Sequence, residues 1–407
     1  MKFFTCVAAR RRLAPLASAF LLFASAAAPA APVLRHAADQ HGDFVLFGNT
    51  VARDCGSASA PLIGTVGDCG MNIVDSGADV FWRSDDPTPG EVRADVGITA
   101  ADAASTAVLQ LPPNANITYA RLYWSAQAAS ASPDPMVTIA RPGVFSQTVT
   151  ADGSWVATRG ATPFFQSTAD ITSLLRAQGA GAYRVSGIEV RDPVDQNDDE
   201  LFVAWSVVVF YRLASEPLRH LAVFDGLDVV DNTALSSATI QGFVVPTAGH
   251  DGKLGVIAYE GDSTQTGDSL RFNGVDLADA ANPASDFFNS SRSRLGTFVS
   301  VAGDLPQATG AAGSMSGVDL DVVDLTSTLS SGQTSALVEA VSTGDVFLVG
   351  GFVTSIVTSR PLFTSTRKTF TDLNGGAVQP GDVVEYTITT QNTGSDAAVE
   401  VTLSDAL

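Results

Sequence analysis

Hydrophobic and polar residues alternate with a period of two over many short stretches of the chain, and Gly, Pro, Asn or Asp ends each stretch. This alternation is typical of half-buried β-strands. It predicts strands at 105–112, 117–124, 136–141 and 182–190, and it continues through the second half of the chain. Many short strands with regular turn signals favour an all-β protein built from jelly-roll or immunoglobulin-like β-sandwiches.

Two longer apolar stretches interrupt the alternation, "FVAWSVVVFY" at 202–211 and "VFLVGGFVTSIV" at 346–357. Both are too short for a membrane-spanning helix, which needs about 20 residues. Their richness in Val and Phe predicts buried strands instead, with Trp205 in the core.

A single helix is predicted over 167–181, as a connector between strands. Ser167 or Thr168 is expected to cap it, and Gly179 is expected to end it.

A short internal repeat accompanies this helix. "ADITSLL" at 169–175 is echoed by "VDLTSTL" at 323–329, and each is followed by a Gly-containing turn, an alternating strand and one of the long buried strands. We interpret this as two related β-sandwich domains, 31–217 and 218–360, divided near Pro217. Chance similarity of turn sequences is the alternative.

The first 30 residues have the features of a secretory signal. Lys2 and the arginines at 10–12 are basic, 13–27 is apolar, and an A-x-A pattern favours cleavage after Ala30. A retained membrane anchor is the alternative, but the apolar run is short and ends in Ala and Pro. We expect an exported chain, secreted or at the cell surface.

The charge balance becomes more acidic once this signal is removed. The whole chain has 23 basic and 43 acidic residues, and the signal contains four of the basic and none of the acidic ones. Such a chain disfavours nucleic acid and anionic lipid as partners, because both carry negative charge. It favours solubility and weak binding of divalent cations.

The cysteines agree with export. Cys6 lies in the signal, which leaves Cys55 and Cys69 in "DCGSASAPLIGTVGDCG". In an exported chain we expect these two to form a disulfide, worth about 3 kcal/mol for a loop of this size. A metal site is the alternative, but the spacing is not CxxC and no His lies nearby.

The segment 361–407 has a different pattern, rich in Ser and Thr. Its stretches "TDLNGG", "VQPGDVVEYTITTQNTG" and "VTLSDAL" resemble the conserved repeat domain found in tandem in large bacterial surface proteins. The resemblance implies an immunoglobulin-like sandwich, but it covers less than half of such a domain. We therefore expect an incomplete repeat that is poorly packed or leans on 345–360.

The preceding part of the chain, from about 47 to 360, resembles the amino-terminal region of an adventurous gliding motility protein family. The stretches that carry the resemblance include "FGNTVARDCG", "DVFWRSDDP", "ARLYWSAQ", "FFQSTADITSLL", "VVVFYRLA" and "LAVFDGLD". The family implies a long secreted or surface protein and gives no catalytic residues. We expect a non-catalytic structural or adhesive protein whose partners are surface or extracellular-matrix components.

Catalytic motifs are weak. "TGDSL" at 266–270 matches the nucleophile block of a serine esterase family, with Ser269 as nucleophile, but that chemistry needs a downstream histidine as base. All four histidines precede Ser269: His36, His41, His220 and His250.

An acidic loop at 191–200 is the candidate calcium site, since Ca²⁺ takes six to eight oxygen ligands. Its oxygen-bearing residues are Asp192, Asp195, Asn197, Asp198, Asp199 and Glu200. A solvated acidic turn is the alternative, because the spacing fits no known calcium loop. No other cofactor is expected.

One aromatic residue suggests an alternative function. Trp155 lies between turn residues in "ADGSWVATRG", so its ring is the one most open to stacking against a sugar. A carbohydrate-binding module that attaches to extracellular polysaccharide is therefore the second hypothesis.

Overall fold

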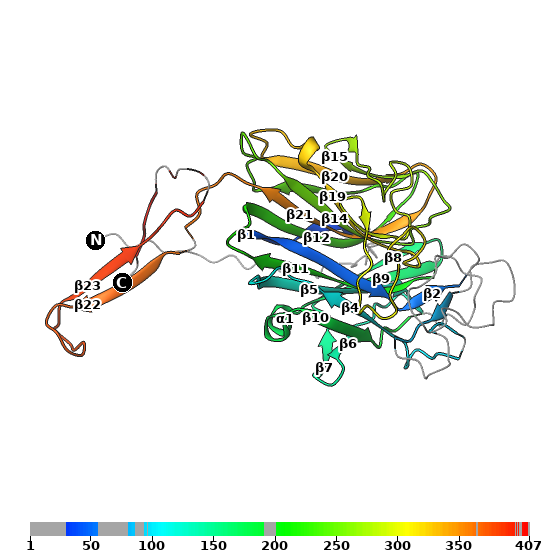
Figure 1. Ribbon diagram of the computed structural model, residues 1–407, viewed down its shortest axis with the longest axis horizontal. Helices are drawn as coiled ribbons and strands as arrows, with labels where there is room; N and C mark the ends of the chain where they lie inside the picture. The colour runs from blue at the N-terminus through cyan, green and yellow to red at the C-terminus, as the bar shows by residue number, and fades with distance from the viewer. Residues whose placement is uncertain are drawn as a thin grey trace, which may run out of the picture.

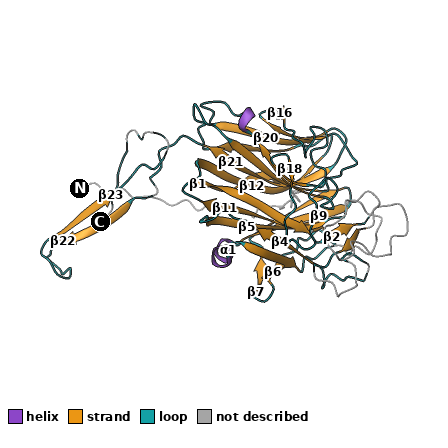
Figure 2. Ribbon diagram, viewed as in Figure 1, coloured by secondary structure: helices purple, strands orange, loops and turns teal. Residues whose placement is uncertain are grey.

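The computed structural model describes residues 30–55, 80–85, 93–95, 97–190, 201–363, 365–394, 396, 398 and 401–405. Strands make up most of this part of the chain, as the alternation predicts (Figure 2). The described residues contain one α-helix, α1 Thr172–Gln178, and one 3₁₀ turn, η1 Thr326–Thr328. Neither is long enough to span a membrane.

The first half of the chain forms strands β1 Ala30–Thr50, β2 Ala52–Asp54, β3 Val80–Trp82, β4 Ala104–Leu109, β5 Asn116–Gln127, β6 Met136–Arg141, β7 Phe145–Thr150, β8 Gly153–Arg159, β9 Thr162–Asp170, β10 Gly181–Ser186 and β11 Val203–Arg212. The second half forms β12 Leu218–Val230, β13 Ser236–Gln241, β14 Gly252–Tyr259, β15 Asp268–Phe272, β16 Val275–Asp276, β17 Arg292–Arg294, β18 Thr297–Phe298, β19 Val318–Asp324, β20 Ser335–Ser342 and β21 Phe347–Val357. A hairpin of β22 Arg367–Asp372 and β23 Val384–Thr389 follows.

One large sheet runs through both halves, in the order β18-β17-β19-β14-β21-β12-β1-β11-β5-β9-β8. Strand β1 joins the halves, because it changes partner along its length of 21 residues. Its first part pairs with β12, up to His41 opposite Leu218. Its second part pairs with β11, from Gly42 opposite Arg212 to Thr50 opposite Ala204.

The large sheet folds over on itself at β1. Strands β14 and β9 are six positions apart in the sheet order, which is roughly 29 Å in a flat sheet with strands about 4.8 Å apart. Yet the Tyr259 hydroxyl of β14 donates to Oε1 of Gln166 in β9 at 2.6 Å. The two halves of the sheet therefore lie face to face.

Two smaller sheets cover the outer faces, which gives a stack of four layers (Figure 1). The order β4-β10-β6-β7 covers the first half and β13-β20-β15-β16 covers the second. One hydrophobic core fills each outer sandwich, and a third core, with residues from both halves, fills the centre. Trp205 belongs to the first core and is 1% exposed, as predicted.

The two halves share their strand order, which supports the predicted internal repeat, but β8 runs antiparallel to β9 whereas β17 runs parallel to β19. The order β1-β11-β5-β9-β8 corresponds to β12-β21-β14-β19-β17, and β4-β10-β6-β7 corresponds to β13-β20-β15-β16. The echoed motifs occupy equivalent places, since α1 follows β9 and η1 follows β19. The predicted boundary at Pro217 falls between β11 and β12, but β1 pairs with both of these strands.

The helix prediction was too long at its start. Residues 162–170 form β9, so Ser167 and Thr168 are strand residues and Ile171 occupies the N-cap. Pairing of β9 with β5 and β8 supplies more hydrogen bonds than one short helix could make. Gly179 ends the helix, as predicted.

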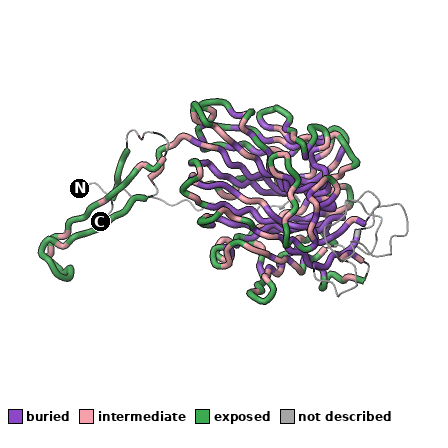
Figure 3. Tube along the Cα trace, viewed as in Figure 1, coloured by how far each residue is buried: buried purple, intermediate pink, exposed green. Residues whose placement is uncertain are grey.

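The C-terminal hairpin projects from the body (Figure 3). Strands β22 and β23 pair with each other, and Phe370 and Tyr386 between them are 61% and 48% exposed. No residue of the described hairpin joins a core cluster. This agrees with the expectation of a poorly packed segment.

Candidate functional site: an open strand edge in an apolar groove

The second part of β1 has one edge without a strand partner. In an antiparallel pair the backbone groups of successive residues point alternately to the two edges. Val51 N–H donates to Val203 O at 2.7 Å, so by the same register Val45 and Phe47 face β11. Phe44, Leu46 and Gly48 therefore point their backbone groups to the opposite edge, where no described strand lies beside them.

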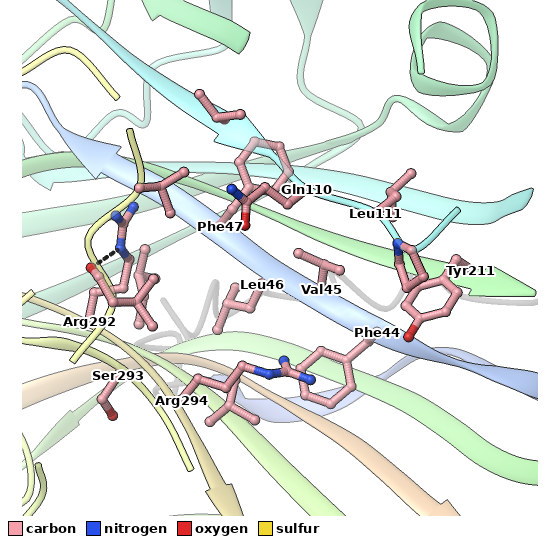
Figure 4. Close-up of a pocket in the computed structure, with 16 residues that line it drawn as sticks. Phe44, Val45, Leu46, Phe47, Gln110, Leu111, Tyr211, Arg292, Ser293 and Arg294 are labelled. Carbon is pink, nitrogen blue, oxygen red and sulfur yellow. Dashed lines mark hydrogen bonds between the residues drawn. The ribbon is translucent and has the colours of Figure 1, made fainter. Parts of the chain in front are cut away.

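This edge lies in a groove of about 310 Å³ (Figure 4). We call it the β1 groove. One wall comes from the end of β4 and the turn after it, with Val108, Gln110, Leu111 and Pro112. The other wall comes from β17, β19 and the loop after β18, with Arg292, Ser293, Arg294, Val299, Val301, Leu320 and Val322. The lining is mostly apolar, with two guanidinium groups on one side.

Arg292 closes one end of the β1 groove. Its Nη1 donates to Gly48 O at 3.1 Å and its Nε donates to Val299 O at 3.1 Å. Its Nη2 donates to Asp304 at 2.6 Å, and Asp304 accepts from the Val108 backbone at 2.8 Å. Burial raises the pKa of Asp304, and the Arg292 charge opposes that rise. This network fixes both walls to β1 at Gly48.

Arg294 is different, because it is not committed to any such network. It is half-buried in the groove lining, and no described residue gives it a hydrogen bond or an ion pair. Its charge acts on the Tyr211 phenol. Burial raises the pKa of that phenol to about 12, and the positive charge of Arg294 opposes the rise. The side chain is available to an anionic group that enters the groove.

The backbone of the open edge is equally available. Phe44 N–H is satisfied locally by the Asp43 carboxylate at 2.9 Å, and Gly48 O by Arg292. In the described part of the chain, Leu46 N–H, Leu46 C=O and Phe44 C=O have no hydrogen-bond partner. Strand edges of this kind pair readily with another extended chain.

A second polar site lies between the two halves of the large sheet. Asp225 is fully buried on β12. Its two carboxylate oxygens both accept from Arg35 Nε, at 3.0 and 2.9 Å. The Tyr123 hydroxyl donates to it at 3.1 Å, and Arg121 Nε lies 3.6 Å away. Burial raises the pKa of Asp225, whereas Arg35 and Arg121 lower it. The cluster joins β1, β5 and β12, and because Asp225 and Arg121 are buried within it, its role is structural.

A buried acidic pair occupies β19. Asp319 accepts from the Ser291 backbone at 3.0 Å and Asp321 from the Ser291 hydroxyl at 3.2 Å. Burial raises the pKa of Asp321 to about 7 and that of Asp319 well above its usual range. Among the residues that the structure describes, no group of three or more acidic, His or Cys side chains is placed to hold a metal ion.

The structure describes only some of the residues singled out by the sequence. The acidic loop 191–200, with Asp192, Asp195, Asn197, Asp198, Asp199 and Glu200, lies outside the described residues, so the calcium site stays a prediction. Cys69 also lies outside them, whereas Cys55 is 5% exposed beside Phe81 and Ala94. The Cys55–Cys69 disulfide stays a prediction.

Trp155 lies on β8, the last strand of the large sheet. Its ring is half-buried against the central core, and the Arg35 guanidinium lies over it at 5.5 Å from the ring centre. One face available to a sugar is therefore already covered. The carbohydrate-binding hypothesis stays a prediction without support from this geometry.

The histidines and Ser269 are not brought together. Ser269 lies in strand β15, and its hydroxyl donates to Ala284 O at 2.6 Å. His220 Nδ1 lies 2.7 Å from Asp39 Oδ1, but in the described part of the chain no Ser, Thr or Cys side chain is hydrogen-bonded to a histidine. The geometry assembles no serine nucleophile with its base.

Sequence reasoning missed the β1 groove. Its residues come from β1, β4 and β17–β19, which only the fold brings together. The stretch "DFVLFGN" at 43–49 indicates a buried strand, but it carries no signal that one edge of this strand stays open.

No protein-family model matches the chain, and no curated protein matches it. The resemblances to a gliding motility family and to a surface repeat domain therefore stay predictions.

Proposed function

We propose that this chain is an exported, non-catalytic structural or adhesive protein that works by holding a segment of a partner on its surface. The observation that carries the proposal is the β1 groove, where an open strand edge, an apolar lining and an uncommitted Arg294 face the same space. Binding, rather than bond making, is what such a surface offers.

The rest of the molecule suits this role. The four stacked layers are tied by a continuous central core, so the groove is held on a stiff body. The hairpin extends from that body, as a connection to further surface repeats would. The resemblance to the gliding motility family supports a place at the bacterial exterior, with a link to motility.

The test is carried out in the bacterium that encodes the chain. We expect deletion of the gene to reduce attachment to a surface and gliding speed, and the wild-type gene to restore both. A Val301→Trp variant, which fills the groove, should fail to restore them. Val275→Trp, on an exposed strand of the far small sheet, is the matched control and should restore them. Equal rescue by both variants, at equal protein levels, contradicts the proposal.

A further inference from the structure

We propose that the β1 groove binds an extended segment of a partner protein that adds to β1 as an antiparallel strand and places an Asp or Glu beside Arg294. This inference rests on the proposed binding function and names the chemistry of the partner.

The internal repeat shows what the edge accepts. Strand β12 is the counterpart of β1 in the second half of the body, and both pair with the long buried strand of their own half. Phe47 and Phe224 both point to the outer core of their half, whereas Phe44 and Leu221 both point to the central core. The remaining edges of the two strands are therefore equivalent.

In the second half this edge is filled. The first part of β1 pairs with β12 as an antiparallel strand, with Ala37 opposite Ala222 and Asp39 opposite His220. In the first half the equivalent edge, from Phe44 to Gly48, has no strand beside it among the described residues. The same fold thus contains one occupied and one open copy of a strand-binding edge.

The surroundings of the two edges correspond in their place in the sheet order, although not in strand direction. The filled edge passes β8, where Trp155 lies under Arg35 of the added strand. The open edge passes β17, which has the place of β8 in the sheet order, and there Arg292 and Arg294 line the groove. At the filled edge the guanidinium group, that of Arg35, belongs to the added strand. In the groove the guanidinium groups belong to the wall, so an added strand would lie beside them.

The charges decide the chemistry of the occupant. In the filled edge the added strand supplies the cation, Arg35, and β12 supplies the anion, Asp225. In the groove the wall supplies the cation, Arg294, and it has no described partner. A carboxylate on the added strand pairs with it, in a partly desolvated place where such hydrogen bonds are strong.

The apolar lining and the length of the edge define the remaining features. Phe44 to Gly48 spans roughly 14 Å at about 3.4 Å per residue, which accommodates about five to seven residues of an extended peptide. Leu320, Val322 and Leu111 line the space on either side, so alternate side chains of the peptide need to be apolar. The chain's own strand of this kind, the first part of β1, is already paired with β12.

Synthetic peptides test the proposal on the purified chain. The probe is an acetylated octapeptide of alternating Val and Thr with one central Asp, titrated by fluorescence anisotropy. The same peptide with Lys in place of Asp should bind at least tenfold more weakly. N-methylation of one alternate set of backbone amides should weaken binding at least tenfold, and N-methylation of the other set less than about twofold, because only one set faces β1.

Variants of the chain separate charge from shape. Arg294→Ala should remove the preference for Asp over Lys. Arg271→Ala, in an exposed ion pair on the far small sheet, is the matched control and should keep it. Binding that is indifferent to backbone methylation, or a preference that survives Arg294→Ala, overturns the proposal, as does a dissociation constant weaker than about 1 mM for the Asp probe.

Amide exchange tests the open edge without any ligand. In the chain alone, Leu46 N–H should exchange rapidly and Phe47 N–H slowly, and the Asp probe should slow Leu46. A protected Leu46 in a chain that light scattering shows to be a dimer means that a second copy fills the edge, which overturns the proposal. Loss of attachment on gene deletion without peptide binding leaves the adhesive function standing and removes this inference. Peptide binding without an attachment phenotype supports this inference and removes the adhesive function.

Discussion

At the scale of single residues, one buried carboxylate connects the two halves of the body. Asp225 has Arg35, Arg121 and Tyr123 around it and no exposure to solvent. Its replacement by Asn removes the acid that pairs with Arg35 and leaves Arg121 with Asp152 at the surface as its remaining acidic partner. We expect Asp225→Asn to lower the free energy of unfolding by about 1–3 kcal/mol in urea denaturation, because hydrogen bonds to a charged buried group are lost.

The matched control for this change is Asp276→Asn, in the exposed pair with Arg271. Exposed ion pairs contribute only about 0–1 kcal/mol, so this variant should be nearly neutral. Equal effects of the two substitutions would show that the central cluster does not hold the halves together.

The buried acid Asp321 makes stability depend on pH. Its pKa is raised from 3.8 in the unfolded chain to about 7 in the folded protein, because burial disfavours the carboxylate. The folded state therefore holds the extra proton between these values, and the contribution to stability is present at low pH and lost as pH rises through about 7. Asp321→Asn mimics the protonated acid and removes this dependence.

The measurement compares the wild type with Asp321→Asn from pH 5 to pH 8. We expect the free energy of unfolding of the wild type to fall, relative to that of the variant, by about 1–3 kcal/mol over this interval. Parallel curves for the two proteins would mean that Asp321 is ionised in the folded state.

Residue-scale predictions from sequence were good for the core and poor for the site. Trp205 was predicted in the core because it lies in an apolar run, and burial of such runs depends little on topology. Arg292, Arg294 and Leu46 could not be predicted, because each depends on which strands become neighbours. Trp155 was predicted to be open to a sugar because its neighbours in the sequence are turn residues. Those neighbours did not reveal the Arg35 guanidinium above its ring.

At the scale of elements, β1 depends on a glycine at the point where it changes partner. A Cβ on Gly42 would lie 1.9 Å from Tyr211 O, so the backbone of β11 must move to admit one. We expect Gly42→Ala to lower the free energy of unfolding by about 1–3 kcal/mol in urea denaturation. Gly97→Ala in an exposed loop, where the nearest atom to a Cβ is a flexible Asp95 oxygen, is the control and should be nearly neutral. A neutral Gly42→Ala would show that β1 tolerates a wider gap there.

Elements with strong alternation were predicted close to their observed bounds. The stretch 136–141 is β6, and 117–124 lies within β5. The start of the helix was misplaced because Ser167 and Thr168 are as suitable for an N-cap as for a strand. Their pairing with β5 places them in a strand. The double pairing of β1 was beyond sequence patterns, since alternation does not say which strand lies at each edge.

At the scale of the whole molecule, a seven-residue echo was enough to predict the duplication. It is now supported by two sets of strands in the same order. The stacking of the halves through a third core was not predicted. Its residues lie on the second faces of strands such as β5 and β14, and their apolar character shows burial without naming the opposite layer.

The hairpin of β22 and β23 is the part of the molecule that the body needs least. After the hairpin, Thr393 O lies 3.4 Å from His41 Nε2 of the body, and no described residue of the hairpin belongs to a core cluster. We expect a chain that ends at Phe363 to unfold within about 2 °C of the full chain in calorimetry, because almost no buried apolar area is lost. A chain shortened instead at Asp345, which loses β21 from the centre of the large sheet, is the control and should not fold. A drop of more than about 5 °C for the first truncation would mean that the hairpin packs on the body in solution, and that the segment resembling a surface repeat is part of the folded unit rather than a projection from it.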